Sequence, residues 1–415
     1  MKIYRGNIVY SKSAKELISY ENGYLLVENG KVLSVEKELK EEYKNNEIID
    51  IKNSLIIPAF SDLHVHAPQY PNRGIQMDLL LNDWLNKYTF PLESKYKDES
   101  FARSVYSKFA AELLKYGTMH AVILGTIHNN ATDILMEELE KRGISSFVGK
   151  VNMDKNSPSY LIETTDESIK NTELFIKKHL NNKYAKPILT PRFAPTCSFE
   201  LLKRLGELSD KYNIGVQTHI VESLWEAEEA KKCYEGCKCD MEIYEKAGLL
   251  KHKPFVAAHY IFPSELDLKL LKECGGFAVQ CPDSTSNVIA GIMRTGYLLD
   301  NNINLGIGSD IAAGEYLGIY RGVSSSVRLS KIKSFYEKDN RTIDFSEAFY
   351  MATKMSGSIF GKVGSFEKGY DFDALVISGI EDGYEKLTPI ELAERFCYLG
   401  ETTNISHRFL RGEEI

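Results

Sequence analysis

The sequence predicts an α/β protein in which a (β/α)8 TIM-type barrel carries a small β-sandwich domain formed from both chain termini. Eight short apolar runs alternate with segments of helical pattern across the middle of the chain. Both ends read as β structure instead, and polar residues suited to catalysis follow several of the runs. Strands that alternate with helices favour a parallel sheet, and eight such units favour a closed barrel.

The two ends of the chain predict the small domain. Asn29-Gly30 separates two apolar runs in YLLVENGKVLSVEK, which is a strong hairpin signal. Near the other end, DFDALVIS at 371–378 reads as a strand. We therefore expect residues 1–57 and 365–415 to form the small domain and residues 58–364 to form the catalytic barrel.

The eight runs are apolar throughout, as expected of strands buried on both faces. They occupy residues 55–60, 118–125, 145–151, 187–193, 215–220, 254–260, 277–281 and 303–308. Apolar residues recur at helical spacing between them, for example in 103–116 and 345–358. An open doubly wound sheet is the alternative, but it ordinarily has fewer strands, and no G-x-G-x-x-G follows the first run.

Composition excludes several classes of function. The 415 residues are 43% hydrophobic and 26% charged, with a net charge of −7, and no dense basic stripe suggests a nucleic-acid partner. No stretch approaches the roughly 18 apolar residues of a membrane helix, so we expect no membrane partner. Seven scattered cysteines favour a reducing, cytoplasmic location.

Two histidines, His64 and His66, follow the first run. Residues i and i+2 of a strand point to one face, so both imidazoles can reach one metal ion. His219 lies at the end of run five and Asp310 follows run eight, which adds a third imidazole and a carboxylate. A lone histidine is more often structural, but four such residues at predicted strand ends indicate a catalytic zinc site.

Other polar residues near the same ends are candidates for catalysis or binding. Glu222, three residues after His219, suits general acid–base work, although it could be a charge at a helix start. His259 at the end of run six suits a neighbour of the metal-bound water, or it could satisfy a buried backbone group. Arg192 after run four could bind substrate or form a structural ion pair.

Six segments together resemble the guanine deaminase family of the metal-dependent amidohydrolase superfamily: DLHVHAPQYPNRG, DWLNKYTFPLESKY, TPRF, QTHIVES, AAHYIF and GSDIAAG. The histidines and the aspartate mark only the superfamily, whereas the HAPQYPNRG loop, DWLNKYTFP and TPRF are more specific. The resemblance extends from about Pro58 to Gly364 and on into GKVGSFEKGYDFDALVI.

The resemblance implies roles for individual residues. The metal would be held by His64, His66, His219 and Asp310, and catalysis would involve Glu222, His259 and Asp310. The purine would contact His66, Ala67, Pro68, Gln69, Arg192, Phe193, His219, Glu222 and Asp310. Phe193 either stacks on the purine or packs in the core.

The reaction implied is attack of metal-bound hydroxide on C2 of guanine, giving xanthine and ammonia in purine catabolism. Related barrels bridge two metals through a carboxylated lysine at the end of strand four, but ILTPRF has no lysine there, so we expect one divalent ion per chain. That ion would be Zn²⁺, with Fe²⁺ as the alternative. The resemblance also implies a homodimer.

Three alternatives stay open at this point. A related deaminase or chlorohydrolase could act on another purine, a pyrimidine or a triazine ring. A binuclear ring-opening hydrolase would hold two metals. A barrel without catalytic activity would serve as a scaffold, but such proteins typically lose metal ligands.

Overall fold

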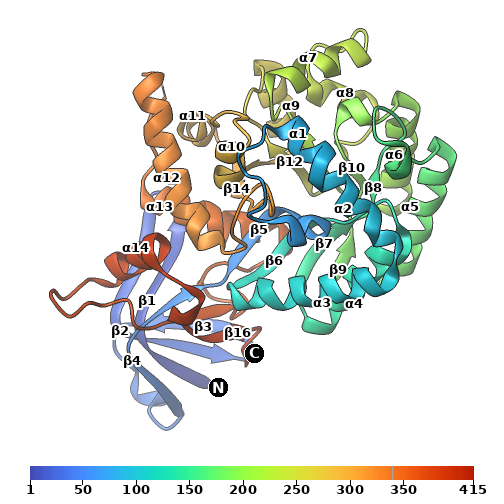
Figure 1. Ribbon diagram of the computed structural model, residues 1–415. Helices are drawn as coiled ribbons and strands as arrows, with labels where there is room; N and C mark the ends of the chain where they lie inside the picture. The colour runs from blue at the N-terminus through green and yellow to red at the C-terminus, as the bar shows by residue number, and fades with distance from the viewer. Residues whose placement is uncertain (339) are drawn as a thin grey trace.

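The computed structural model describes residues 1–338 and 340–415. Figure 1 shows a larger body of short strands surrounded by helices, and a smaller body at the lower left that is dominated by long strands and contains both termini. The residues that bear on function lie in the larger body.

The larger body is built on parallel strands. In the described ranges its strands are β5 (Phe60–His66), β6 (Thr118–Leu124), β7 (Ser145–Gly149), β8 (Val151–Asn152), β9 (Ala185–Pro187), β10 (Thr190–Pro191), β11 (Val216–Ile220), β12 (Phe255–His259), β13 (Phe277–Gln280) and β14 (Asn304–Ile307). They pair in the orders β5-β6-β7-β9, β8-β10 and β11-β12-β13-β14.

Contacts at the sheet margins bring the ladders together. Leu189 forms a parallel bridge to Val216 at the start of β11. Beyond β14, the Asp310 N–H donates to the backbone oxygen of His64 in β5 at 2.9 Å. The last parallel strand therefore approaches the first, as in a barrel-type fold.

Five of the predicted runs are confirmed as strands to within two residues: 118–125, 215–220, 254–260, 277–281 and 303–308. The runs 145–151 and 187–193 are each divided into two short strands. The break after Gly149 falls at Lys150, a buried lysine whose ammonium group needs polar partners.

The prediction for the first run is wrong in its position. Residues 55–58 belong to β4 (Glu47–Pro58) of the smaller body, where Leu55–Pro58 pair with β15. The strand of the larger body starts at Phe60 and ends at His66, so His64 and His66 lie within it rather than after it. Both strands are buried, and a continuous apolar run cannot show where one ends.

Helices cover the parallel strands, except that the last helix packs on the sheet of the smaller body. In the described ranges they are α1 (Leu81–Trp84), α2 (Phe90–Ser94), α3 (Glu99–Lys115), α4 (Asn129–Arg142), α5 (Thr165–His179), α6 (Phe199–Tyr212), α7 (Leu224–Cys233), α8 (Asp240–Lys246), α9 (Glu265–Cys274), α10 (Pro282–Asn287), α11 (Thr295–Asp300), α12 (Ile319–Tyr336), α13 (Phe345–Tyr350) and α14 (Pro389–Leu399). None of these described helices has both the length and the apolar character needed to cross a membrane.

Two predicted helices illustrate how local chemistry sets their ends. The helix expected at 103–116 starts earlier, at Glu99, because the Asp98 side chain accepts hydrogen bonds from the N–H groups of Ser100 and Phe101. The helix expected at 345–358 is regular only to Tyr350 and continues as a wider π-helical turn to Met355.

The smaller body is a single mixed sheet. Its described strands are β1 (Lys2–Ser13), β2 (Glu16–Glu28), β3 (Lys31–Glu36), β4, β15 (Ala374–Ile377), β16 (Ile405–Leu410) and β17 (Glu413–Glu414), in the order β17-β16-β15-β4-β1-β2-β3. The hairpin predicted at Asn29-Gly30 joins β2 to β3, and both residues have positive φ, 51° and 75°. Only backbones of that shape close a two-residue hairpin without splaying its strands.

This sheet differs from the predicted β-sandwich because its strands are joined in one hydrogen-bonded order. Lys31 at the edge strand β3 also bridges Asp371, which precedes β15, so the sheet curls on itself instead of stacking on a second sheet. The proposed division at residues 57/58 and 364/365 stays a prediction.

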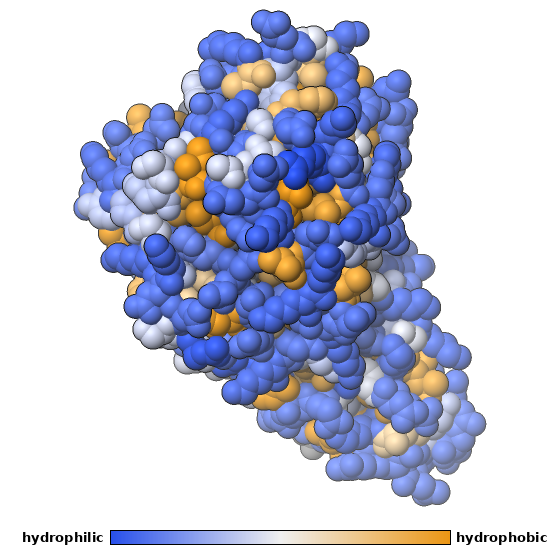
Figure 2. Space-filling model, turned by 90° about the vertical axis from the view of Figure 1, so that its right-hand side faces the viewer, coloured by the Kyte–Doolittle hydropathy of each residue, from blue (hydrophilic) through white to orange (hydrophobic). Residues whose placement is uncertain are grey.

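The outer surface is consistent with a buried apolar interior. Figure 2 shows one face as mainly hydrophilic, with apolar side chains gathered in separate patches, most of them on the larger body. The interior between the parallel strands and their helices is filled by aliphatic and aromatic side chains, including Phe60, Met119, Leu205 and Leu305.

Candidate functional site

A cavity of about 910 Å³ opens at the carboxyl ends of the parallel strands. Trp84 of α1 and Trp225 of α7 belong to its wall. Side chains from several strand ends reach it, namely His66, Gln69, Arg192, Phe193, His219, Glu222, His259 and Asp310. In a parallel α/β fold this is the edge where ligands bind.

Three imidazoles converge at this cavity, and two of them, those of His66 and His219, line it. His64 and His66 are both buried, and their rings lie 4.9 Å apart between centroids. Nε2 of His66 is 3.1 Å from Nε2 of His219. The i and i+2 spacing on β5 therefore does aim both imidazoles at one point, where β11 supplies the third.

Asp310 completes the cluster. Its Oδ1 lies 3.4 Å from Nε2 of His64 and 3.5 Å from Nε2 of His66. Asp310 has a φ of 43°, which is uncommon for a residue other than glycine. The backbone hydrogen bond from Asp310 to His64 holds this conformation and directs the carboxylate at the imidazoles.

The imidazoles are held by their own partners. The Nδ1–H of His219 donates to the backbone oxygen of Arg192 at 2.6 Å, which leaves Nε2 unprotonated and facing the cluster. Asp62 accepts the His64 backbone N–H at 3.0 Å and the Ser309 N–H at 3.1 Å, and so ties β5 to the segment after β14. Sequence analysis did not identify Asp62, although it lies two residues before His64.

These donors fit a divalent metal ion. The candidate ligand atoms lie within 4.8 Å of one another in two groups that share His64. Burial lowers the pKa values of His66 and His219 well below normal, which favours neutral imidazoles with a free lone pair. Nε2 of His64 is buried and has no hydrogen-bond partner among the described residues, as expected of a nitrogen that binds a cation.

Cys281 is a further neighbour of this cluster that sequence analysis missed. It follows β13 and lies with His64, His259 and Asp310 in the second group of possible ligands. Burial raises the pKa of its thiol well above the usual value. Its position at the end of the predicted run 277–281 could have identified Cys281 from the sequence.

Glu222 lies beside the cluster on the cavity wall. Its Oε1 is 3.7 Å from Nε2 of His259, and Oδ2 of Asp310 is 3.9 Å from the same nitrogen. Burial raises the pKa of Glu222 to about 8, and the negative charge of Asp310 adds to this effect. A carboxyl with such a pKa can both accept and donate a proton near neutral pH.

A second buried acid holds the backbone of Glu222. Oε2 of Glu226 accepts the Glu222 N–H at 2.8 Å, whereas its Oε1 has no partner among the described residues. The charge of Asp240 adds to the effect of burial on the pKa of Glu226, so the two carboxyls are neighbours. Burial raises the pKa of both, that of Asp240 to about 7, so the pair holds a proton near neutral pH.

The opposite side of the cavity carries the residues predicted to contact a purine. Gln69 and Arg192 belong to its wall and both bind Glu93, a buried residue of α2 that sequence analysis missed. The guanidinium carbon of Arg192 lies 5.2 Å from the centre of the Phe90 ring. The ion pair considered for Arg192 is therefore present. It does not remove Arg192 from the cavity, because Arg192 also belongs to the cavity wall.

Ala67 and Pro68 differ from the other predicted contacts. Both are buried in the short helical segment Ala67–Asn72, and neither belongs to the cavity wall among the described residues. Phe193 does line the cavity. Gln69, Arg192 and Phe193 thus line the cavity, and contact of any of the five residues with a ligand stays a prediction.

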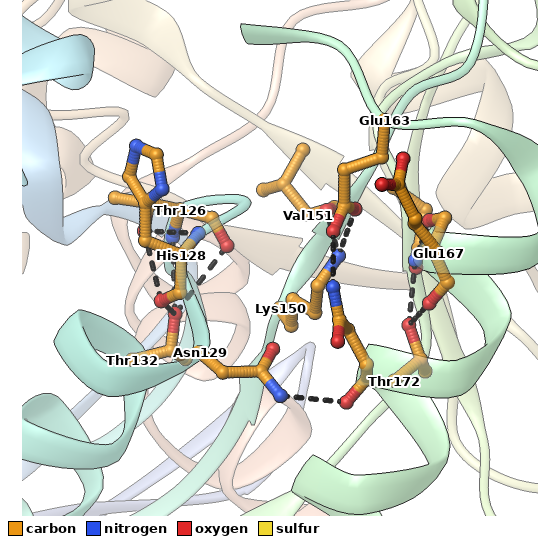
Figure 3. Close-up of polar contacts among 12 residues, drawn as sticks. Thr126, His128, Asn129, Thr132, Lys150, Val151, Glu163, Glu167 and Thr172 are labelled. Carbon is orange, nitrogen blue, oxygen red and sulfur yellow. Dashed lines mark hydrogen bonds and ion pairs between the residues drawn. The ribbon is translucent and has the colours of Figure 1, made fainter. Parts of the chain in front are cut away.

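Lys150 lies away from this wall. Figure 3 shows it facing Glu163, with which it forms an ion pair, and its Nζ also donates to the backbone oxygen of Val151 at 3.2 Å. Asn171 donates to the other oxygen of Glu163 at 2.8 Å. Lys150 does not line the described cavity, and its ion pair with Glu163 tethers the segment after β8.

Comparisons with known proteins agree with this geometry. Residues 55–415 match the model of the amidohydrolase family. A guanine deaminase of Dictyostelium discoideum is 34% identical over 100% of this chain and 98% of its own, and that of Homo sapiens is 32% identical over 100% and 96%. The crystal structure of a guanine deaminase from C. acetobutylicum, which has guanine bound in its active site, is 42% identical with a TM-score of 0.96 over 100% of this chain and 99% of that one.

The family model matches most of the chain. The relatives named above align with this chain along nearly their whole length. The site described above lies within the matched region. The chain therefore belongs to the amidohydrolase family, among the relatives that are named guanine deaminases.

Proposed function

We propose that the protein is a guanine deaminase, which hydrolyses guanine to xanthine and ammonia. The observation that carries the proposal is the position of Gln69 and Arg192, two groups that can read a purine edge, in the same cavity as His66, His219 and Asp310. The relative with guanine in its active site supports the choice of substrate.

His64, His66, His219 and Asp310 would hold one divalent ion, and the three nitrogens and one oxygen favour Zn²⁺, with Fe²⁺ as the alternative. Such an ion, when bound, lowers the pKa of a water molecule from 15.7 to about 7 and so supplies a nucleophile at neutral pH. The absence of a lysine at the end of β10 supports one ion rather than two.

Glu222 is the proton carrier in this proposal. It takes a proton from the attacking water and delivers it to ring N3 while the water oxygen bonds to C2 of guanine. His259, which lies close to both Glu222 and Asp310, orients that oxygen together with Asp310. A second proton transfer converts the C2 amino group into ammonia, the C2–N bond breaks, and xanthine remains.

The far side of the cavity would hold the purine ring. Arg192 can donate to O6 and N7, which are the acceptors that guanine presents along that edge. Gln69 adds one polar contact, and Phe193 offers a ring on which the purine can stack.

The direct test is a panel of guanine, adenine, cytosine, isocytosine and an aminotriazine, assayed for ammonia and for the ring product. We expect xanthine from guanine, with kcat/KM at least about 100-fold above every other compound, because a site that hydrogen-bonds its substrate rejects rings with mismatched groups. Ammonia release from the triazine without xanthine formation from guanine would assign the chain to another branch of the family.

The proposal has structural parts as well. The eight parallel segments would close into one (β/α)8 barrel, with the curled sheet as the separate small domain. The protein would be cytoplasmic and would act as a homodimer on a small molecule, without nucleic acid or membrane as partner.

A further inference from the structure

Glu93 lies behind the cavity wall and binds two residues of that wall at once. Its Oε1 accepts from Nε2 of Gln69 at 2.9 Å and from Nη2 of Arg192 at 3.3 Å, and its Oε2 accepts from Nη1 of Arg192 at 2.8 Å. Only 4% of Glu93 is exposed, and it does not belong to the described wall itself. A ligand in the cavity therefore meets Gln69 and Arg192, and meets Glu93 only through them.

The charge of Glu93 decides which way the Gln69 amide points. Paired with the Arg192 guanidinium, Glu93 is a carboxylate, and a carboxylate can only accept hydrogen bonds. The Gln69 atom that faces it must therefore be the NH₂ group. The carbonyl oxygen of Gln69 then points away from Glu93 and is the acceptor that this amide offers a ligand.

Arg192 has the opposite polarity. Its guanidinium has no acceptor, and the forked pair with Glu93 uses one N–H on each terminal nitrogen. The remaining N–H groups can only donate. The wall thus offers a ligand one fixed acceptor, from Gln69, and fixed donors, from Arg192.

We propose that Glu93 is a positioning residue that sets this polarity and through it the specificity of the cavity. It selects heterocycles that present a ring N–H to Gln69 and a carbonyl oxygen to Arg192. This inference rests on the proposed function for the identity of the ring, but not for the polarity of the wall.

Guanine and hypoxanthine fit the rule because each has O6 as an acceptor and ring N–H donors. Adenine and 2,6-diaminopurine have an amino group in place of O6 and no hydrogen on N1. They therefore present a donor to Arg192 where an acceptor is required, and an acceptor to the Gln69 carbonyl oxygen where a donor is required. 2,6-Diaminopurine keeps the C2 amino group, so its rejection cannot come from lack of a leaving group.

The test compares wild type with Glu93→Gln. Binding of hypoxanthine and adenine, neither of which has a C2 amino group, is measured by calorimetry, and turnover of guanine and 2,6-diaminopurine by kinetics. In the wild type we expect a preference of at least about 100-fold for the oxo compound of each pair. In Glu93→Gln the new amide can donate as well as accept, so the Gln69 amide can rotate.

For Glu93→Gln we expect the preference for the oxo compound of each pair to fall below about 10-fold. KM for guanine should rise by about 10- to 100-fold, with kcat changed less than about threefold, because the metal cluster and Glu222 are untouched. Gln69→Ala should weaken the binding of hypoxanthine more than that of adenine. In the double variant, the changes in binding free energy from Gln69→Ala and Glu93→Gln should not add.

Glu347→Gln is the matched control, since Glu347 is also a buried carboxylate bound to an arginine, with Oε1 2.9 Å from Nη2 of Arg341, but outside the cavity. We expect it to affect stability and leave the preference unchanged.

The inference is overturned if Glu93→Gln keeps the wild-type preference, or if Glu347→Gln changes that preference equally. Wild type that prefers hypoxanthine to adenine but forms no xanthine from guanine would overturn the proposed reaction and leave the role of Glu93 supported.

Discussion

Glu222 is buried against His259 and Asp310, yet it lies on the cavity wall where a substrate can reach it. Burial stabilises its protonated form, so it can hold a proton during the reaction without a permanent positive partner. The sequence pattern H-x-x-E placed it correctly near His219, but only the structure places it within reach of both His259 and Asp310.

We predict that Glu222→Gln lowers kcat for guanine by about 10²- to 10⁴-fold, because the amide cannot transfer the proton. Bound metal per chain and thermal stability should stay at wild-type levels, since Glu222 is not among the proposed ligands. Glu229→Gln, on the same wall, serves as control and should change kcat less than about threefold. Near-normal turnover of Glu222→Gln would exclude its role as proton carrier.

The strands that carry the cluster were the most predictable elements. Runs such as 215–220 and 303–308 are short, apolar and bounded by turns, so their ends and the residues at those ends could be placed from sequence. The run 55–60 could not, because β4 and β5 are both buried and follow each other almost directly. Glu93 was missed because α2 is a five-residue helix without a clear period, and its partners lie far along the chain.

Helices α7 and α8 bring together a buried acid pair, and this has a consequence for stability. Burial raises the pKa of Asp240 from 3.8 to about 7 in the folded protein. Between these pH values the folded state retains a proton on Asp240 that the unfolded state has lost. The contribution of Asp240 to the free energy of unfolding is therefore most favourable below pH 3.8, and it is lost as pH rises to about 7. At about 1.4 kcal/mol per unit, the cost by pH 8 is on the order of 4 kcal/mol.

We therefore predict that Asp240→Asn raises the melting temperature at pH 8 by several degrees and raises it less at pH 5, because asparagine carries no charge to bury. Thermal unfolding at the two pH values measures this. A variant that is less stable than wild type at pH 8 would show that the two carboxyls do not hold a proton in common.

The two bodies of the molecule are joined by a buried polar chain. Nε2 of His120 in β6 lies 2.9 Å from Oδ2 of Asp373, which immediately precedes β15, and its Nδ1 lies 3.2 Å from the Ser61 hydroxyl. All three residues are almost fully buried. The position of His120 between the parallel strands and the curled sheet indicates a structural role.

We predict that His120→Ala lowers the free energy of unfolding by about 3–5 kcal/mol, because Asp373 loses its buried partner. Urea unfolding measures this, with His407→Ala as control. His407 forms an exposed pair with Glu414, so its loss should cost less than about 1 kcal/mol. A cost for His120→Ala no larger than that of the control would mean that this contact does not hold the two bodies together.

The most direct test of the whole account measures bound metal and guanine turnover on the same samples while the metal is removed with a chelator and then restored with zinc. We predict one ion per chain in the active protein, with xanthine formation falling and returning in proportion to it, and no tightly bound ion in His219→Ala. Full turnover of guanine by protein that holds no metal would contradict the account.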